Sequence, residues 1–441
     1  MLTKFLYTKI DNSSLIVFRV IFGLLIFFES IGAIFTGWVR ETLVGPQFTF
    51  NFIGLDFLQP LPGNGMYYYF AIMGLFGFFV MIGYRYRWSI SVFTLMWAGV
   101  YFMQKASYNN HYYLLLLLCL IMMVLPANSY LSVDVKRHPE QQKIWMYSWC
   151  KWLIIFQLLL VYTYAAIAKL YPGWLDLSFF KVLMGTKSEY PLVGDLLQKE
   201  SLHWFLMVSG IVFDLLIIPL LLIKKTRKWA FMAAVVFHLF NSVIFQIGIF
   251  PYMSLALCLF FFEPETIRKL FLKQKPLYTA TQVEIPSYHR VLLVLCAAYV
   301  IIQITLPIRH WFIEQPVLWT EEGHRMSWRM MLRSKGSIIE FKVLNHDTKQ
   351  LQRVDLSAYL SPKQRRVIGG KPDMIWQFAQ RLKKQYNAKG FDVSVFATDS
   401  RISINGGPWQ EFVDPDVDLA AQPWHYFSHE PWITPYKKAS K

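Results

Sequence analysis

The sequence predicts an α-helical polytopic membrane protein with about nine transmembrane helices, followed by a small extracytoplasmic α+β domain. The first observation behind this prediction is composition. Of the 441 residues, 55% are hydrophobic and only 16% are charged, which is too apolar for an ordinary soluble enzyme. The second is a series of long apolar runs, and the third is the position of the basic residues in the loops between them.

The apolar runs set the expected number of spans. A run of roughly 17 to 25 residues is long enough to cross a bilayer as a helix. The fourth and eighth runs are short, and the seventh and eighth are contiguous. We expect spans at 14–37, 66–84, 88–104, 111–126, 145–168, 203–223, 229–247, 248–263 and 289–311.

Lysine and arginine cluster in loops that all fall on one side of the predicted membrane. The loops of the other side, at 38–65, 105–110 and 169–202, contain fewer of them. Because cytoplasmic loops are enriched in basic residues, we expect a cytoplasmic N-terminus and an outer location for everything after the ninth span. Topology thus explains the net charge of +16, and we expect no nucleic-acid partner. The clustered residues are Lys4, Lys9, Arg85, Arg87, Lys136, Arg137, Lys143, Lys224, Lys225, Arg227, Lys228, Arg268, Lys269, Lys273 and Lys275.

The last 130 or so residues differ in composition from the rest of the chain. Residues 337–344 alternate like a strand, 374–386 have helical spacing, and 391–397 and 401–404 are expected to be further strands. We therefore divide the chain into a transmembrane domain at 1–311 and an extracytoplasmic α+β domain at 312–441.

The four cysteines predict neither disulfides nor a metal site. Cys119, Cys150, Cys258 and Cys296 fall inside or at the edges of predicted spans, and none belongs to a CxxC pair. A disulfide framework or a cysteine-based zinc site requires a different spacing, so we expect no metal.

Polar residues inside or at the ends of spans are costly in a bilayer and indicate function. One group is the segment 105–111, which opens the fourth span. A second is Gln157, Tyr162 and Lys169 on the fifth span, and a third is the pair formed by His238 and Asn241 on the seventh. The predicted topology brings all three groups toward the outer face.

Helical spacing aligns these polar residues on two faces. Tyr162, Ala165, Ala166 and Lys169 follow the spacing i, i+3, i+4 and i+7, so they line one stripe about two turns long. The two alanines leave room for a flat ligand. His238 and Asn241 are also i and i+3. The spacing predicts a polar pocket near the outer leaflet.

Two interpretations of these residues stay open at this point. A lysine shielded from water is disfavoured as the ammonium, so Lys169 could act as a neutral general base. It could equally be an anchor that snorkels to the membrane surface. His238 could be a hydrogen-bonded core histidine, and Asn109 and Asn110 could simply cap a helix.

Short motifs distributed over nearly the whole chain, from about residue 14 to 424, carry a family resemblance. In this order and spacing, they resemble the vitamin K-dependent γ-glutamyl carboxylase family, whose membrane part is also called the HTTM domain. The motifs are SLIVFR (14–19), SYNNHYYL (107–114), SVD (132–134), AKLYPGW (168–174), FHLFNS (237–242), IGIFPY (247–252), Trp319, SWRMM (327–331) and DPDVD (414–418).

The resemblance implies a peptidyl-glutamate 4-carboxylase-like enzyme. In that family, a neutral lysine deprotonates reduced vitamin K, which reacts with dioxygen and becomes a strong base on its way to the 2,3-epoxide. That base removes a γ-proton from a peptide glutamate, and the carbanion takes up carbon dioxide. The implied cofactor is menaquinol or phylloquinol, with O2 and CO2 as cosubstrates. The implied partners are the lipid bilayer, the quinone and a glutamate-containing exported peptide or protein. As a short bacterial-type homologue, the chain is expected in the inner membrane, with its active site on the extracytoplasmic side.

The resemblance also assigns residues. It implies that Lys169 is the base, that Asn110 and His111 lie beside the quinone, and that His238 is a second catalytic histidine; Tyr162 and Asn241 complete the expected quinone site. The substrate glutamate is expected to meet Trp319, Ser327, Trp328, Arg333 and Lys335.

Three residues depart from the family pattern. Ala168 precedes Lys169 where vertebrate members have a second lysine. Arg329 stands where an acid is usual, and Asp416 stands where a base is usual. The quinone half of the reaction is therefore better supported than the peptide half.

Three functions from different classes follow. The leading one is the carboxylase described above. The second is a quinol oxygenase or epoxidase of the same fold without peptide carboxylation. The third is a non-enzymatic protein that binds quinone or lipid, with Lys169 only anchoring a helix.

Overall fold

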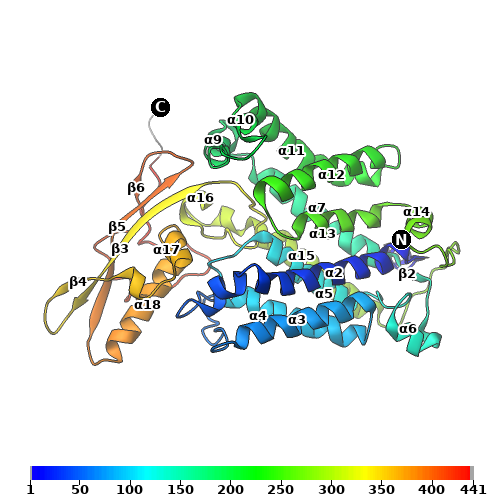
Figure 1. Cartoon of the computed structure of the whole chain (residues 1–441), viewed down its shortest axis with the longest axis horizontal. Coiled ribbons are helices and arrows are strands. Elements are labelled where there is room, and N and C mark those ends of the chain that lie inside the picture. Colours follow the sequence, from blue (N-terminus) through cyan, green and yellow to red (C-terminus); the bar gives the residue numbers. More distant parts are fainter. Residues whose placement is uncertain (1, 438–441) are drawn as a thin grey trace.

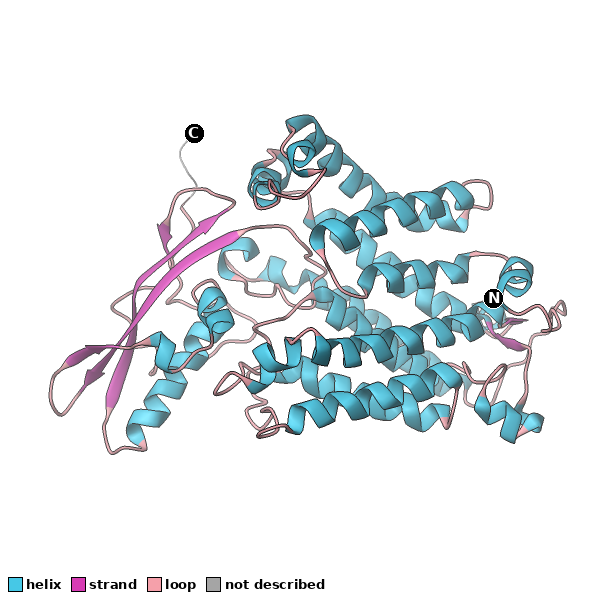
Figure 2. Cartoon of the chain, viewed as in Figure 1, coloured by secondary structure: helices cyan, strands magenta, loops and turns pink. Residues whose placement is uncertain are grey.

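The computed structural model describes residues 2–437. Long helices run side by side along the longest axis of the molecule, and a sheet with two helices lies beyond one end of them (Figures 1 and 2). The N-terminus lies at the opposite end of the bundle (Figure 1). The molecule is thus mostly helical, with a small sheet-containing domain formed by the C-terminal part of the chain.

Within residues 2–437, six helices are long and apolar enough to cross a membrane. All nine segments expected as spans are helical, but the count of nine is not confirmed. Helix α5 has only 15 residues, about 22 Å of rise, which is short of a hydrocarbon core of about 30 Å. The six are α2 (Ser13–Phe35), α3 (Gly65–Ile82), α7 (Ser148–Ala168), α11 (Glu200–Leu222), α12 (Arg227–Phe245) and α15 (His289–Ile308) with the adjoining η4 (Arg309–Phe312); the other three are α4 (Tyr86–Met103), α5 (Asn110–Val124) and α13 (Phe250–Leu257) with η3 (Cys258–Phe261).

Shorter helical elements connect these helices or belong to the C-terminal domain. Among them, α8 and α9 follow Lys169 directly, and α16 precedes the sheet. They are α1 (Leu2–Leu6), η1 (Arg40–Val44), α6 (Val133–Arg137), η2 (Pro139–Gln141), α8 (Pro172–Leu175), α9 (Ser178–Gly185), α10 (Gly194–Leu197), α14 (Pro264–Phe271), α16 (Val317–Thr320), η5 (Leu356–Ala358), α17 (Pro362–Ile368) and α18 (Pro372–Asn387).

Small residues let α2 and α3 approach closely. A Cβ atom added to Gly77 of α3 would lie 2.9 Å from the backbone nitrogen of Phe27, and one added to Gly23 of α2 would collide with the backbone of Met81. Close backbone approach through small residues is a common way for helices to associate in membranes. Together with α4 and α5, this pair forms a buried apolar core that includes Phe18 and Phe93.

A two-stranded ribbon closes the end of the bundle that carries the N-terminus. Strand β1 (Lys9–Asp11) pairs antiparallel with β2 (Trp145–Tyr147), which directly precedes α7. The carboxylate of Asp11 accepts from Lys275 Nζ at 2.8 Å, and both side chains are buried. Three segments far apart in the sequence are therefore joined at this end.

The C-terminal sheet has the strand order β4-β3-β5-β6, with antiparallel neighbours. The strands are β3 (Lys335–Asn345), β4 (Leu351–Arg353), β5 (Val393–Ile404) and β6 (Gln410–Glu411). The strand expected at 337–344 and the helix expected at 374–386 correspond to β3 and α18. The two strands expected at 391–397 and 401–404 are one continuous strand, because β5 stays paired with β3 across a register shift between Ile338 and Glu340. Phe341 and Phe378 pack edge to face in the core between sheet and helix.

Buried ion pairs join the C-terminal domain to the bundle. Asp373, at the start of α18, pairs with Lys105 from the loop before α5 and with Arg325 from the segment after α16, each at 2.6 Å. Burial alone would raise the pKa of Asp373, but the charges of Arg325 and Lys105 hold this pKa well below its usual value. Burial lowers the pKa of Lys105 to about 8. Gln364 Nε2 adds a hydrogen bond to the carbonyl oxygen of Phe48 at 2.7 Å.

Asp373→Asn is expected to lower the free energy of unfolding by about 3–5 kcal/mol, because it leaves two buried cations without their carboxylate. Thermal unfolding of the purified protein, followed by tryptophan fluorescence, measures this loss. The carboxylate stabilises the fold at neutral pH, and its contribution is lost as the pH falls below about 4 toward the lower pKa of the folded state.

Asp399→Asn is the control, because its pair with Arg401 is about half exposed and is worth about 1 kcal/mol or less. Equal losses in both variants would contradict the prediction.

Candidate active site

A cavity of about 910 Å³, counted with the space at its open mouth, lies between α7, α11 and α12. Residues from the segment 174–184, Met330 and Met331, and His111, Ile247 and Phe250 also line it. A largely apolar wall with a few polar groups is typical of a ligand site. The aromatic residues of the wall are Trp174, Phe179, Phe180, Phe237, Phe240, Phe245 and Phe250, and the polar ones are His111, Tyr162, Lys169, Ser209, Asp214, His238 and Asn241.

Lys169 is the C-cap residue of α7 and reaches into this cavity, where its Nζ forms an ion pair with Asp214 Oδ2 of α11. The side chains are only 10% and 5% exposed, respectively. Lys169 Nζ also lies 5.4 Å from the centre of the Trp174 ring. An ammonium that snorkels to a membrane surface would be in water, whereas this amine is enclosed by protein and paired.

Sequence reasoning missed Asp214, although a signal for it was present. It is the only acid in the apolar run at 203–223, and an ionisable residue within a span is a functional candidate by default. The three polar groups expected from the sequence do not include it. The partner of Lys169 therefore comes from the sixth expected span.

Tyr162 and His238 join α7 to α12 across the cavity. The Tyr162 hydroxyl and His238 Nε2 are 3.0 Å apart. His238 Nδ1 is buried and has no hydrogen-bond partner among the described residues. Phe213 and Phe237 stack beside this pair, with ring centres 3.9 Å apart. Tyr162, Lys169, His238 and Asn241 thus line one cavity, whereas Ala165 and Ala166, expected on the same stripe, are buried outside its wall.

His111 lies at the border between two cavities. Its ring centre is 4.1 Å from that of Phe250. A second cavity, of about 1550 Å³ with its open mouth, begins on the other side and is lined by Glu29 of α2. Because His111 and Phe250 line both spaces, they form a partition between them.

Asn110 faces away from the cavity that His111 lines. Its Oδ1 accepts from the Tyr108 hydroxyl at 2.9 Å, and its Nδ2 donates to the carbonyl oxygen of Arg329 at 3.1 Å. The cap of α5 is Asn109, whose Oδ1 accepts from the backbone of Tyr112 at 2.8 Å. Asn110 therefore ties the start of α5 to the segment that precedes the sheet.

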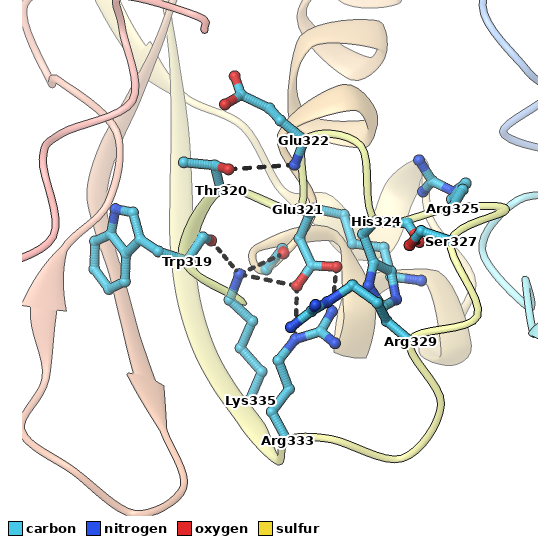
Figure 3. Close-up of polar contacts among 12 residues, drawn as sticks. Trp319, Thr320, Glu321, Glu322, His324, Arg325, Ser327, Arg329, Arg333 and Lys335 are labelled. Carbon is cyan, nitrogen blue, oxygen red and sulfur yellow. Dashed lines mark hydrogen bonds and ion pairs between the residues drawn. The ribbon is translucent and has the colours of Figure 1, made fainter. Parts of the chain in front are cut away.

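The basic residues expected to bind the substrate glutamate surround an acid of this chain (Figure 3). Arg333 Nε donates to Glu321 Oε1 at 2.9 Å, and Lys335 Nζ lies 3.3 Å from the same oxygen. Against the effect of burial, Arg333 and Lys335 hold the pKa of Glu321 well below its usual value, and burial lowers the pKa of Lys335 to about 8. Lys335 also donates to the carbonyl oxygen of Trp319 at 2.7 Å (Figure 3).

The three neutral residues of that expected site are held by hydrogen bonds or packing. Trp319 Nε1 donates to the carbonyl oxygen of Thr434 at 2.7 Å, and the Ser327 hydroxyl donates to the carbonyl oxygen of His324. The Trp328 ring is buried, and its centre is 5.0 Å from that of Tyr113. Neither these three nor the two basic residues line the cavity that contains Lys169.

Comparison with known families gives two matches that together cover nearly the whole chain. Residues 7–265 match the HTTM domain, and residues 288–439 match the vitamin K-dependent gamma-carboxylase, lumenal domain. The chain belongs to the vitamin K-dependent gamma-carboxylase family. No solved structure matches it.

Membership in the vitamin K-dependent gamma-carboxylase family makes the chain an integral membrane protein with a lumenal-type domain, and implies a vitamin K hydroquinone as cofactor. The cavity residues fit such a group. Aromatic walls suit a flat ring, and the unpartnered Nδ1 of His238 and the Lys169–Asp214 pair suit its two hydroxyl groups.

Proposed function

We propose that this protein is a γ-carboxylase-like integral membrane enzyme in which Lys169 takes a proton from a reduced naphthoquinone, either menaquinol or phylloquinol. The coupled product is γ-carboxyglutamate, made from glutamate in an exported peptide or protein with CO2. The observation that carries the proposal is the buried Lys169–Asp214 pair on the wall of an apolar cavity.

The pair offers a route to a neutral amine. Separated charges are costly in apolar surroundings. Transfer of one proton from the Lys169 ammonium to the Asp214 carboxylate converts two buried charges into a neutral amine and a neutral acid. Lys169 then has a lone pair with which to accept the quinol proton.

When bound, the reduced quinone reacts with dioxygen to the epoxide and supplies the strong base that the glutamate γ-proton requires. The protein's part is to exclude water, which would quench such a base. The Trp174, Phe180 and Phe237 side chains serve this purpose on the cavity wall. His238, held by Tyr162, and Asn241 are the groups that we propose orient the ring hydroxyls, with His111 at the partition.

We propose the bacterial inner membrane as the location, with a cytoplasmic N-terminus and the active site and residues 312–441 on the extracytoplasmic side. The basic residues in loops on one side of the bundle support this orientation. For the peptide, we propose that the segment from Trp319 to Lys335 receives the glutamate. Arg333 and Lys335 contribute two positive charges against the single charge of Glu321.

One assay separates the three candidate functions. Purified protein in detergent receives reduced vitamin K, O2, bicarbonate and a short glutamate peptide, and both the epoxide and γ-carboxyglutamate are quantified. Both products are expected. Epoxide alone would support the quinol oxygenase, and neither product would support a binding protein.

Tyr162→Phe is expected to raise the KM for the reduced quinone about fivefold, because loss of one buried hydrogen bond of about 1 kcal/mol frees the His238 ring. Steady-state kinetics with varied quinol measure the change. Tyr164→Phe is the matched control on the same helix, because its hydroxyl donates to the carbonyl oxygen of Ile304 instead. An unchanged KM in Tyr162→Phe would remove the His238 ring from the quinone site.

A further inference from the structure

Arg329 is a buried guanidinium without a carboxylate partner in the described part of the chain. The residue is 9% exposed. Its Nη1 donates to His310 Nε2 at 3.4 Å, and its Nε is buried with no partner among the described residues. A buried cation is normally paired with an acid, because an isolated charge is costly away from water. Arg329 thus has unused capacity to bind an anion.

The acid whose charge acts on Arg329 is already engaged. Glu321 forms ion pairs with Arg333 and Lys335. Burial and, next, the charge of Arg333 lower the pKa of the Arg329 guanidinium to about 10. An added negative charge would therefore be stabilised there.

Arg329 is adjacent in the sequence to the wall of the cavity that contains Lys169. The two residues that follow it, Met330 and Met331, line the cavity. Its own carbonyl oxygen accepts from Asn110, the neighbour of the cavity residue His111. In Figure 3, the side chain of Arg329 lies beside those of Arg333 and Glu321.

The chemistry of glutamate requires its carboxylate to be bound close to the cavity in which the reaction takes place. The γ-carbon is bonded directly to the carboxylate carbon, so the group that binds the carboxylate must lie close to the space in which the γ-proton is removed. A guanidinium binds a carboxylate in a bidentate manner with fixed geometry. Arg333 and Lys335 share the carboxylate of Glu321, whereas Arg329 has no carboxylate partner among the described residues and directly precedes two residues of the cavity wall.

We propose that Arg329 binds the side-chain carboxylate of the substrate glutamate and directs its γ-carbon toward the Lys169 cavity. The proposal rests on the proposed carboxylase function. It assigns substrate specificity to a position where the family resemblance implies an acid.

Arg329→Gln tests the proposal in the full-length purified protein. The KM for a glutamate peptide is expected to rise tenfold or more, while the KM for the reduced quinone changes less than twofold. The Kd of a fluorescein-labelled glutamate peptide, measured without quinone by fluorescence anisotropy, should rise by the same factor. The same peptide with glutamine in place of glutamate should bind the wild type as weakly as the glutamate peptide binds Arg329→Gln.

Arg381→Gln is the matched control. This arginine is also without an acid among its described contacts and stacks over Phe48 at 3.8 Å, on the C-terminal domain and outside the cavity. Its peptide KM is expected to stay at the wild-type value. Arg329→Lys keeps the charge but loses the bidentate geometry, so a threefold or greater rise in peptide KM is expected. This variant decides the matter alone if Arg329→Gln does not fold.

The outcomes separate the two proposals. If the wild type forms neither product, the carboxylase function fails. If the wild type carboxylates the peptide but the Arg329 variants keep its KM and Kd, the function stands and the role of Arg329 is overturned.

Discussion

Lys169→Ala is expected to reduce formation of both the epoxide and γ-carboxyglutamate by about 1000-fold, within the range of about 10²–10⁴ typical of a lost general base. Both products fall together because the lysine acts on the quinol, before the two halves of the reaction diverge. Chromatographic quantification of both products from the purified variant, with quinol and peptide at saturating concentrations, measures the loss.

Lys169→Arg distinguishes a base from an anchor. Arginine keeps the positive charge and would preserve an anchor or an ion pair with Asp214, but it stays protonated and cannot accept a proton. The base role therefore predicts that Lys169→Arg is as inactive as Lys169→Ala. Lys181→Ala is the matched control, because Lys181 is exposed and its Nζ lies 3.9 Å from Glu200 Oε2 at the surface. Wild-type activity in Lys169→Arg would reject the base role.

Asp214→Asn is expected to lower kcat about 100-fold, because an amide cannot take up the proton that Lys169 must lose. The volume of the side chain is nearly unchanged, so the KM for the quinol should change less than threefold. Asp214→Glu, which retains the carboxyl group, should recover part of the rate. Steady-state kinetics of the three proteins give kcat and KM separately.

Glu200→Gln is the control for the loss of an acid from the same helix. Glu200 begins α11, and its side chain is 64% exposed. Its substitution is expected to leave kcat within twofold of the wild type. If Asp214→Asn also keeps kcat, Asp214 only positions α11, and the proton of Lys169 has another destination.

Much of the membrane part could be predicted from hydropathy, because a helix in lipid must be apolar over a set length. All nine expected segments are helical. Their number as spans could not be predicted, because an apolar run such as α5 has the same composition whether it crosses the bilayer or packs inside the bundle. In the C-terminal domain, the sequence predicts two strands where the structure has the single strand β5, because a bulge interrupts the alternation of apolar and polar residues without ending the strand.

The candidate site could be predicted as far as local periodicity extends. Spacing on one helix placed Tyr162 and Lys169 together, and His238 with Asn241. It could not indicate that Asn110 binds the backbone of Arg329, 219 residues away, or that Glu321 occupies Arg333. Long-range partners are set by tertiary packing, which a single sequence does not encode in any local pattern.

The ribbon of β1 and β2 has a consequence for the order in which the protein is completed during synthesis. Residues 9–11 leave the ribosome well before their strand partner at 145–147 and before Lys275, the counter-ion of Asp11. This end of the molecule can therefore close only after the chain has been translated past Lys275. Until then, Asp11 lacks the buried ion pair that it has in the folded structure, so the N-terminal strand must wait for a segment more than 250 residues further along the chain.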